Sequence, residues 1–83
     1  MRRHELTLPD LAVEGPITVS LWLVEPGSDV TEDEPVVEIL AGNAVVDLPA
    51  TASGRLAEVL AAEDGVVEVG QLLAVIEADE DEP

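Results

Sequence analysis

The chain has 83 residues, no cysteine, 47% hydrophobic residues and a formal net charge of −16. These values exclude a disulfide framework and a zinc–thiolate site, and charge of this sign disfavours binding to nucleic-acid phosphates. We expect one small domain with a compact apolar core, either simply soluble or complementary to a basic partner surface. No apolar run approaches the ~18 residues of a membrane span, and no signal-peptide pattern is present. We therefore expect a cytoplasmic, monomeric domain.

Groups suited to autonomous catalysis are scarce. The sequence has one histidine, His4, and no cysteine. It also has no lysine, since all three of its Lys-or-Arg residues are arginines. Its serines have no histidine nearby in sequence, and most carboxylates fall in turn segments or in the run "EADEDEP". The acidic segments lack the spaced ligands and central glycine of a calcium loop. We expect a domain that is not an enzyme, with no catalytic residue and no metal site.

Short apolar segments separated by turn signals, about every eight to twelve residues, predict an all-β sandwich or barrel. In "ITVSLWLV", apolar residues alternate from Ile17 through Val19 and Leu21 to Leu23. This alternation predicts a strand that buries one face. Trp22 lies within the same strand and is expected to be in the core or half-buried.

The segment "VVEILAGNAVVDLPA", from Val36 to Ala50, reads as two strands that fold back at Gly42 and Asn43. Both residue types tolerate the positive φ of the primed turns that close two-residue hairpins. The sequence therefore predicts a tight hairpin with an exposed tip.

Residues 55–63 carry conflicting signals. Their apolar residues have helical spacing and are followed by a glycine stop, which alone would predict a helix. However, Val19–Ile39 aligns without gaps on Leu56–Ile76 at an offset of 37 residues, with apolar positions matched. Two copies are too few for a solenoid, but they suit two similar β-halves that face each other about a pseudo-twofold axis. The repeat therefore favours a strand over Arg55–Leu60.

After Ile76 the composition becomes acidic and offers nothing to bury. We divide the chain into a folded domain, residues 1–77, and an acidic disordered tail or linker start, residues 78–83.

The order of these segments resembles that of lipoyl domains, the swinging-arm carriers of 2-oxo acid dehydrogenase acyltransferase subunits, in the biotinyl/lipoyl-attachment family. "LTLPDL" is similar to the family's opening strand, "LWLVEPGSDV" to a strand and turn, "VVEILAGNAVVDLPA" to the carrier hairpin and "VEVGQLLAVIE" to the closing strand. Family members have glycines 16 residues before and 11 residues after the carrier lysine, and Gly27 and Gly54 stand at those offsets from Asn43. A simpler interpretation of both glycines is backbone freedom at a turn.

The resemblance covers Glu5 to about Glu77. It implies a flattened barrel of two four-stranded antiparallel sheets with quasi-twofold symmetry. In the family, lipoate is amide-linked to a lysine at the hairpin tip and carries acyl groups between active sites.

Here Asn43 occupies the cofactor-attachment position, and its carboxamide cannot form that linkage. The resemblance therefore implies a domain without lipoate or biotin. The simplest interpretation of Asn43 is that it closes the turn, and the alternative is a contact with a partner. The residues of the carrier hairpin are Ala41, Gly42, Asn43 and Ala44.

The loop "DLAVEGP" corresponds to the family loop that lies beside the carrier tip and helps the cognate decarboxylase recognise its domain. The resemblance makes it a candidate partner-recognition loop, and a plain connection between strands is the alternative. Its residues are Asp10, Leu11, Ala12, Val13, Glu14 and Gly15.

Our first functional hypothesis is a non-carrier lipoyl-like domain for recognition or tethering, with a 2-oxo acid decarboxylase or related complex subunit as its partner. One alternative is a true lipoyl carrier in an engineered or unmodifiable form. Another is an acidic binding protein that occupies a basic partner surface. Added salt would weaken this binding. A purely structural module, as in export-pump adaptors, lacks support because no long helical hairpin is predicted.

Overall fold

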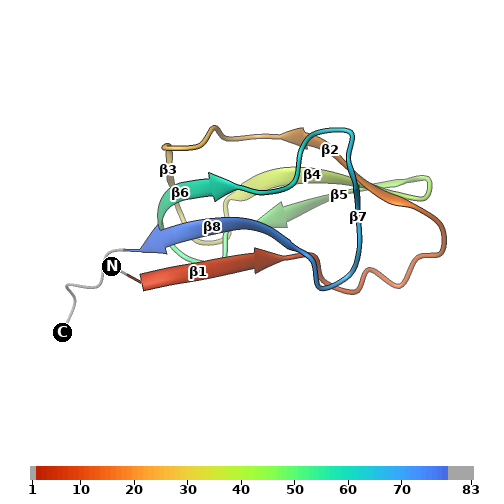
Figure 1. The fold of residues 1–83 in the computed structure, drawn as a ribbon, viewed down its shortest axis with the longest axis horizontal. Coiled ribbons are helices and arrows are strands. Elements are labelled where there is room, and N and C mark those ends of the chain that lie inside the picture. Colours follow the sequence, from red (N-terminus) through yellow and green to blue (C-terminus); the bar gives the residue numbers. More distant parts are fainter. Residues whose placement is uncertain (1, 79–83) are drawn as a thin grey trace.

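The computed structural model describes residues 2–78 as two antiparallel sheets of four strands (Figure 1). Sheet A has the strand order β1-β8-β6-β3 and sheet B the order β5-β4-β2-β7. The strands are β1 (Arg2–Thr7), β2 (Ile17–Trp22), β3 (Asp29–Val30), β4 (Pro35–Ala41), β5 (Ala44–Pro49), β6 (Gly54–Val59), β7 (Val66–Val67) and β8 (Leu72–Ala78). The predicted all-β fold class is confirmed. Strand β6 confirms the strand predicted in this segment over the helix that its apolar spacing alone would predict.

Strand β8 extends to Ala78, the first residue of the segment that we expected to be a tail. The remainder of that segment, residues 79–83, lies outside the described residues. Within residues 2–78, no helix has the length and apolar character to cross a membrane.

The two sheets repeat each other as the sequence repeat predicts. Strands β2, β3 and β4 map onto β6, β7 and β8 at the 37-residue offset, and their bounds agree residue for residue. Strands β1 and β5 take equivalent edge positions beside β8 and β4. Every strand of sheet A therefore has a counterpart at the same place in sheet B, as a pseudo-twofold axis between the sheets requires.

The irregularities of the sheets are repeated as well. The register of β2 against β4 shifts between Val19 and Leu21, and that of β6 against β8 shifts between Leu56 and Glu58. A bulge adds one residue and so reverses the faces of the side chains that follow. Leu21 and Leu23 are consequently 44% and 42% exposed. The prediction that the alternation from Ile17 continues to bury one face was wrong beyond Val19.

Left-handed backbone occurs at equivalent turns. Gly27 (φ 92°) corresponds to Asp64 (φ 69°), and Asp33 (φ 75°) corresponds to Gly70 (φ 87°). The N–H groups of Gly27 and Asp64 each donate a 2.7 Å hydrogen bond, to β6 and β2 respectively. The fold thus requires this conformation at both members of each pair, and the aspartates adopt it with more strain than glycine would.

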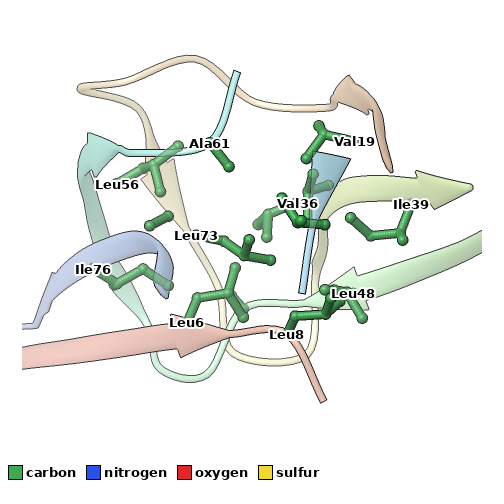
Figure 2. Close-up of a cluster of buried hydrophobic side chains, with 14 of the residues drawn as sticks. Leu6, Leu8, Val19, Val36, Ile39, Leu48, Leu56, Ala61, Leu73 and Ile76 are labelled. Atoms are coloured by element: carbon green, nitrogen blue, oxygen red, sulfur yellow. The ribbon is translucent and has the colours of Figure 1, made fainter. Parts of the chain in front are cut away.

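The core fills the space between the two sheets (Figure 2). Among residues 2–78, every buried side chain is apolar. Trp22 is half-buried against this cluster, as predicted, and its Nε1–H donates a 2.7 Å hydrogen bond to the Ala61 carbonyl. The largest fully buried side chains are Leu8, Val19, Val36, Val37, Ile39, Leu56, Leu73, Val75 and Ile76. Both halves contribute to this set, so the core holds the two sheets together as one unit.

Candidate functional site

The β4–β5 hairpin ends in a two-residue turn at one end of the molecule (Figure 1). Ala41 pairs with Ala44, which leaves only Gly42 and Asn43 between the strands. Gly42 has a φ of 62°, whereas Asn43 is not among the residues with positive φ. A positive φ at the first central residue alone is typical of a type II′ turn, which places glycine there. The predicted tight hairpin is confirmed, and Gly42 alone provides the positive φ of its turn.

The tip presents its side chains to solvent. Gly42, Asn43 and Ala44 are exposed, whereas Ala41 is buried beneath them. The exposed Asn43 side chain is the one polar side chain in this turn, and it offers a carboxamide rather than an amine. This position is accessible to a large partner, since it projects from the end of a two-stranded ribbon.

The loop that follows β1 lies against this tip. The Glu14 carbonyl oxygen would be 3.9 Å from a Cβ added at Gly42. The Ala12 N–H donates a 2.9 Å hydrogen bond to Oδ1 of Asp10, and Ala12 adopts a φ of 57°. Leu11 is half-buried and packs on the core. The candidate recognition loop and the hairpin tip thus form one continuous surface, with Leu11 as the anchor of the loop.

The remaining side chains of this surface are exposed. Val13 is 37% exposed, and Glu14 and Gly15 are exposed beside it. Gly15 has a φ of 97°, which favours glycine at that turn. The loop beside the tip therefore exposes an apolar and an acidic side chain.

The two glycines at family spacing have different roles, and neither contacts the tip. Gly27 has a φ of 92° and open space around its α-carbon, so backbone freedom explains it. Gly54 is a strand residue without positive φ, and a Cβ there would overlap the Glu77 carbonyl oxygen and lie 2.8 Å from the Ala78 α-carbon. Interpreting Gly54 as a source of backbone freedom was therefore wrong, because it permits the close approach of β6 to β8.

The two ends of the described chain lie at the pole opposite the tip (Figure 1). Arg2 pairs with Ala78 there, in the place that corresponds to the pairing of Ala44 with Ala41. A chain attached at this pole would leave the hairpin tip free.

Within residues 2–78, no group of three or more histidine, aspartate or glutamate side chains is arranged to hold a metal ion. His4 lies on β1, opposite Ile76. No serine hydroxyl has histidine as a hydrogen-bond partner in this part of the chain, and Ser20 Oγ donates to Glu38.

A two-layer barrel with pseudo-twofold symmetry, one exposed hairpin tip and chain ends at the far pole defines an attachment-type carrier domain. A family model described as "Biotin-requiring enzyme" matches residues 4–76. The chain therefore belongs to the biotin/lipoyl-attachment family, and its domain is of the type found in 2-oxo acid dehydrogenase acyltransferases. Members of the family carry lipoate covalently on a lysine and act as carrier domains rather than as catalysts.

Individual relatives agree with this assignment. The chain is 40% identical over 73 residues to the dihydrolipoyllysine-residue succinyltransferase component of the 2-oxoglutarate dehydrogenase complex of Haemophilus influenzae, covering 87% of this chain and 18% of that protein. It is 29% identical over 82 residues to the lipoamide acyltransferase component of the branched-chain α-keto acid dehydrogenase complex of Bacillus subtilis, covering 95% of this chain and 19% of that protein. The chain thus spans less than a fifth of the length of these relatives.

A solved structure of similar size gives the same result. The lipoyl domain of the 2-oxoglutarate dehydrogenase complex from Azotobacter vinelandii superposes with a TM-score of 0.74 and 30% identity, over 90% of this chain and 98% of that one. The architecture implied by the sequence resemblance, two four-stranded sheets without helices, is confirmed.

Proposed function

We propose that this chain is a lipoyl-type domain that carries no lipoate and serves as a recognition or tethering module. The observation that carries the proposal is the hairpin tip, where Asn43 stands at the position that the family spacing assigns to lysine, in a sequence without any lysine. A lipoyl amide forms only on a primary amine. The Asn43 carboxamide is not nucleophilic, and the arginine guanidinium groups remain protonated at any physiological pH.

The preserved geometry around the tip supports a role in recognition. Gly42 closes a well-formed turn, and the loop with Val13 and Glu14 lies beside it. Exposed loops on a rigid scaffold are frequent sites of binding. The relatives named above are components of 2-oxo acid dehydrogenase complexes, so the partner proposed here is a 2-oxo acid decarboxylase or another subunit of such a complex.

Intact-mass measurement tests the loss of the carrier role. The chain is incubated with lipoate, ATP and a lipoate ligase, in parallel with Asn43→Lys and with Asn43→Gln as the matched control that lacks an amine. We expect added mass on Asn43→Lys alone, because the turn still presents position 43. Lipoate on an internal peptide of the unaltered chain would overturn the proposal. An unmodified Asn43→Lys would instead show that the tip has lost ligase recognition as well.

A binding measurement tests the recognition role separately. We expect the purified decarboxylase of a 2-oxo acid dehydrogenase complex from the same organism to bind the unaltered chain. Val13→Ser should weaken that binding, whereas Val69→Ser, at a valine outside the loop that is 53% exposed against 37% for Val13, should not. Equal binding by both variants would remove the loop from the interface.

The hypothesis of an acidic binding protein is favoured by one further observation. No cationic residue occurs between Leu8 and Gly54, so the whole of β2, β4 and β5 is free of positive charge. A basic surface would bind this region through charge attraction, with an affinity that falls steeply as salt is added. A decarboxylase interface centred on Val13 would depend less on salt.

A further inference from the structure

The outer face of sheet B carries a row of four side chains, one on each strand, of which three are exposed and apolar and the fourth is the partly exposed Thr18 on β2. Val45 pairs with Leu40, Leu40 with Thr18, and Thr18 with Val66. Val45, Leu40 and Val66 are 60%, 41% and 68% exposed. Directly paired residues of adjacent strands lie on the same face of a sheet. These four residues, which we call the sheet B row, therefore form one continuous stripe at the surface.

The pseudo-symmetry supplies an internal comparison for this stripe. The equivalent residues on sheet A are Arg3, Glu77, Arg55 and Asp29, and they pair in that order across β1, β8, β6 and β3. Their charges alternate in sign, and the Arg55 guanidinium lies 3.4 Å from the Glu77 carboxylate. The same positions of the fold therefore carry alternating charges on sheet A and mainly apolar side chains, with Thr18 between them, on sheet B. The fold itself does not require apolar residues there.

A pair of like charges lies next to the sheet B row. Glu38 and Asp47 are the neighbouring outward residues on β4 and β5, and they pair directly with each other. Like charges placed opposite each other across two strands are destabilising. Glu38 accepts a 3.2 Å hydrogen bond from Ser20, but no ion pair of either carboxylate occurs among residues 2–78. A cation from outside the chain would relieve this repulsion.

From these observations we infer that the outer face of sheet B docks a basic amphipathic helix of a partner protein, whose apolar side chains cover the row and whose lysines or arginines meet Glu38 and Asp47. The spacing agrees with this occupant. Adjacent strands are about 4.8 Å apart, and successive turns of a helix are about 5.4 Å apart. A helix of roughly ten residues laid across the strands would reach from Val45 to Val66.

The charge of the chain argues against a second copy as the occupant. Each copy carries a formal charge of −16, and its sheet B face holds no cation. Two such faces would bring the Glu38–Asp47 pairs together without any compensation. This inference does not depend on whether position 43 is ever lipoylated, since the row lies on the sheet and not at the tip.

The test uses a synthetic helix-forming peptide of about 18 residues, long enough for partial helicity on its own, with a leucine stripe flanked by lysine and arginine. The first control peptide keeps the leucine stripe but has glutamate in place of the flanking lysine and arginine. The second has the same composition as the test peptide in a scrambled order that forms no stripe. The isotope-labelled 83-residue chain is titrated with each peptide and followed by amide chemical shifts. We expect saturable shifts centred on Thr18, Leu40, Val45 and Val66 with the basic amphipathic peptide alone.

Variants then identify the contact. The double substitution Leu40→Gln and Val45→Thr should weaken the peptide about tenfold or more, because it removes two apolar contacts. Val69→Thr is the matched control at a 53% exposed valine outside the row, and it should change affinity by less than about twofold. The exposed positions keep both variants folded, which the spectra themselves verify.

Three results would overturn the inference. The first is equal binding by the double variant and Val69→Thr. The second is equal binding of the glutamate-flanked peptide. The third is concentration-dependent self-association of the unaltered chain through the same amides, which would assign the row to a second copy.

Discussion

Replacing Gly54 by alanine should destabilise the domain far more than a usual glycine-to-alanine change. The added Cβ would overlap the Glu77 carbonyl oxygen and lie 2.8 Å from the Ala78 α-carbon, and both obstacles are backbone atoms that no rotamer change can move. Strand β6 must therefore separate from β8 at the end where Arg55 pairs with Glu77. At the equivalent position of β2, Ile17 accommodates a full side chain and is 7% exposed. The intolerance is thus specific to this half of the fold.

The magnitude follows from three contributions. Relieving the overlap costs about 3 kcal/mol, as for other overpacked sites. Weakening a hydrogen bond at the end of the β6–β8 ladder costs about 1 kcal/mol, and the lower entropy of the unfolded alanine chain returns about 1 kcal/mol. We expect a net loss of about 3 kcal/mol in the free energy of unfolding, or roughly 12–24 °C in Tm for a domain of this size.

Urea denaturation, followed by the fluorescence of Trp22 and by far-ultraviolet circular dichroism, measures this loss. The matched control is Gly27→Ala, where a Cβ meets open space and only the φ of 92° is unfavourable. That control should cost about 1 kcal/mol. The reasoning would be refuted if Gly54→Ala were as mild as Gly27→Ala, or within about 0.5 kcal/mol of the unaltered chain.

Three further substitutions test other features. Asp64→Gly should raise the free energy of unfolding by about 1 kcal/mol in the same urea assay, because it removes left-handed strain at a φ of 69°, and a loss of stability would contradict this. Trp22→Phe should lower the free energy of unfolding by about 1–3 kcal/mol, because the Ala61 carbonyl loses the 2.7 Å hydrogen bond from the indole N–H. Circular dichroism measures this loss, and an unchanged midpoint would mean that water fully replaces the lost donor. Asp47→Asn should stabilise by about 0.5 kcal/mol at low salt, by removing the repulsion from Glu38, and the gain should vanish in about 1 M salt.

The architecture could be predicted because its determinants are local and occur twice. Turn residues and apolar spacing recur at a constant offset, so Arg55–Leu60 could be assigned to a strand against its own helical spacing. The bulges could not be predicted, since the extra residue in β2 is defined only by its partner strand. Alternation therefore failed at Leu21 and Leu23. Gly54 was misinterpreted for a similar reason, because the backbone that crowds it comes from β8.

The candidate site was only partly within reach of the sequence. The hairpin tip was predicted from its own residues, whereas the loop beside it came from the family resemblance, and the structure places Glu14 beside Gly42 accordingly. The type of turn was not predicted, because Gly-Asn fits several primed geometries. The sheet B row was missed, although the 37-residue offset carries its signal: it matches Val66 with Asp29 and, one position beyond the aligned repeat, Leu40 with Glu77. Only strand pairing shows that these unlike positions lie in a line.

The pairing of Arg2 with Ala78 places the two ends of the described chain side by side, so joining these ends would make the backbone circular. The gap between Ala78 and Arg2 and the Gly42–Asn43 turn occupy equivalent places in the two sheets. A circular permutant would join Ala78 to Arg2 through a short glycine-rich turn and open the chain between Gly42 and Asn43. It would keep the same strand pairings. In such a molecule the chain ends would lie at the present tip, and the pole where Arg2 pairs with Ala78 would carry a hairpin turn instead. Which pole displays the hairpin turn and which holds the chain ends is therefore decided by where the chain is opened and not by the sheets themselves.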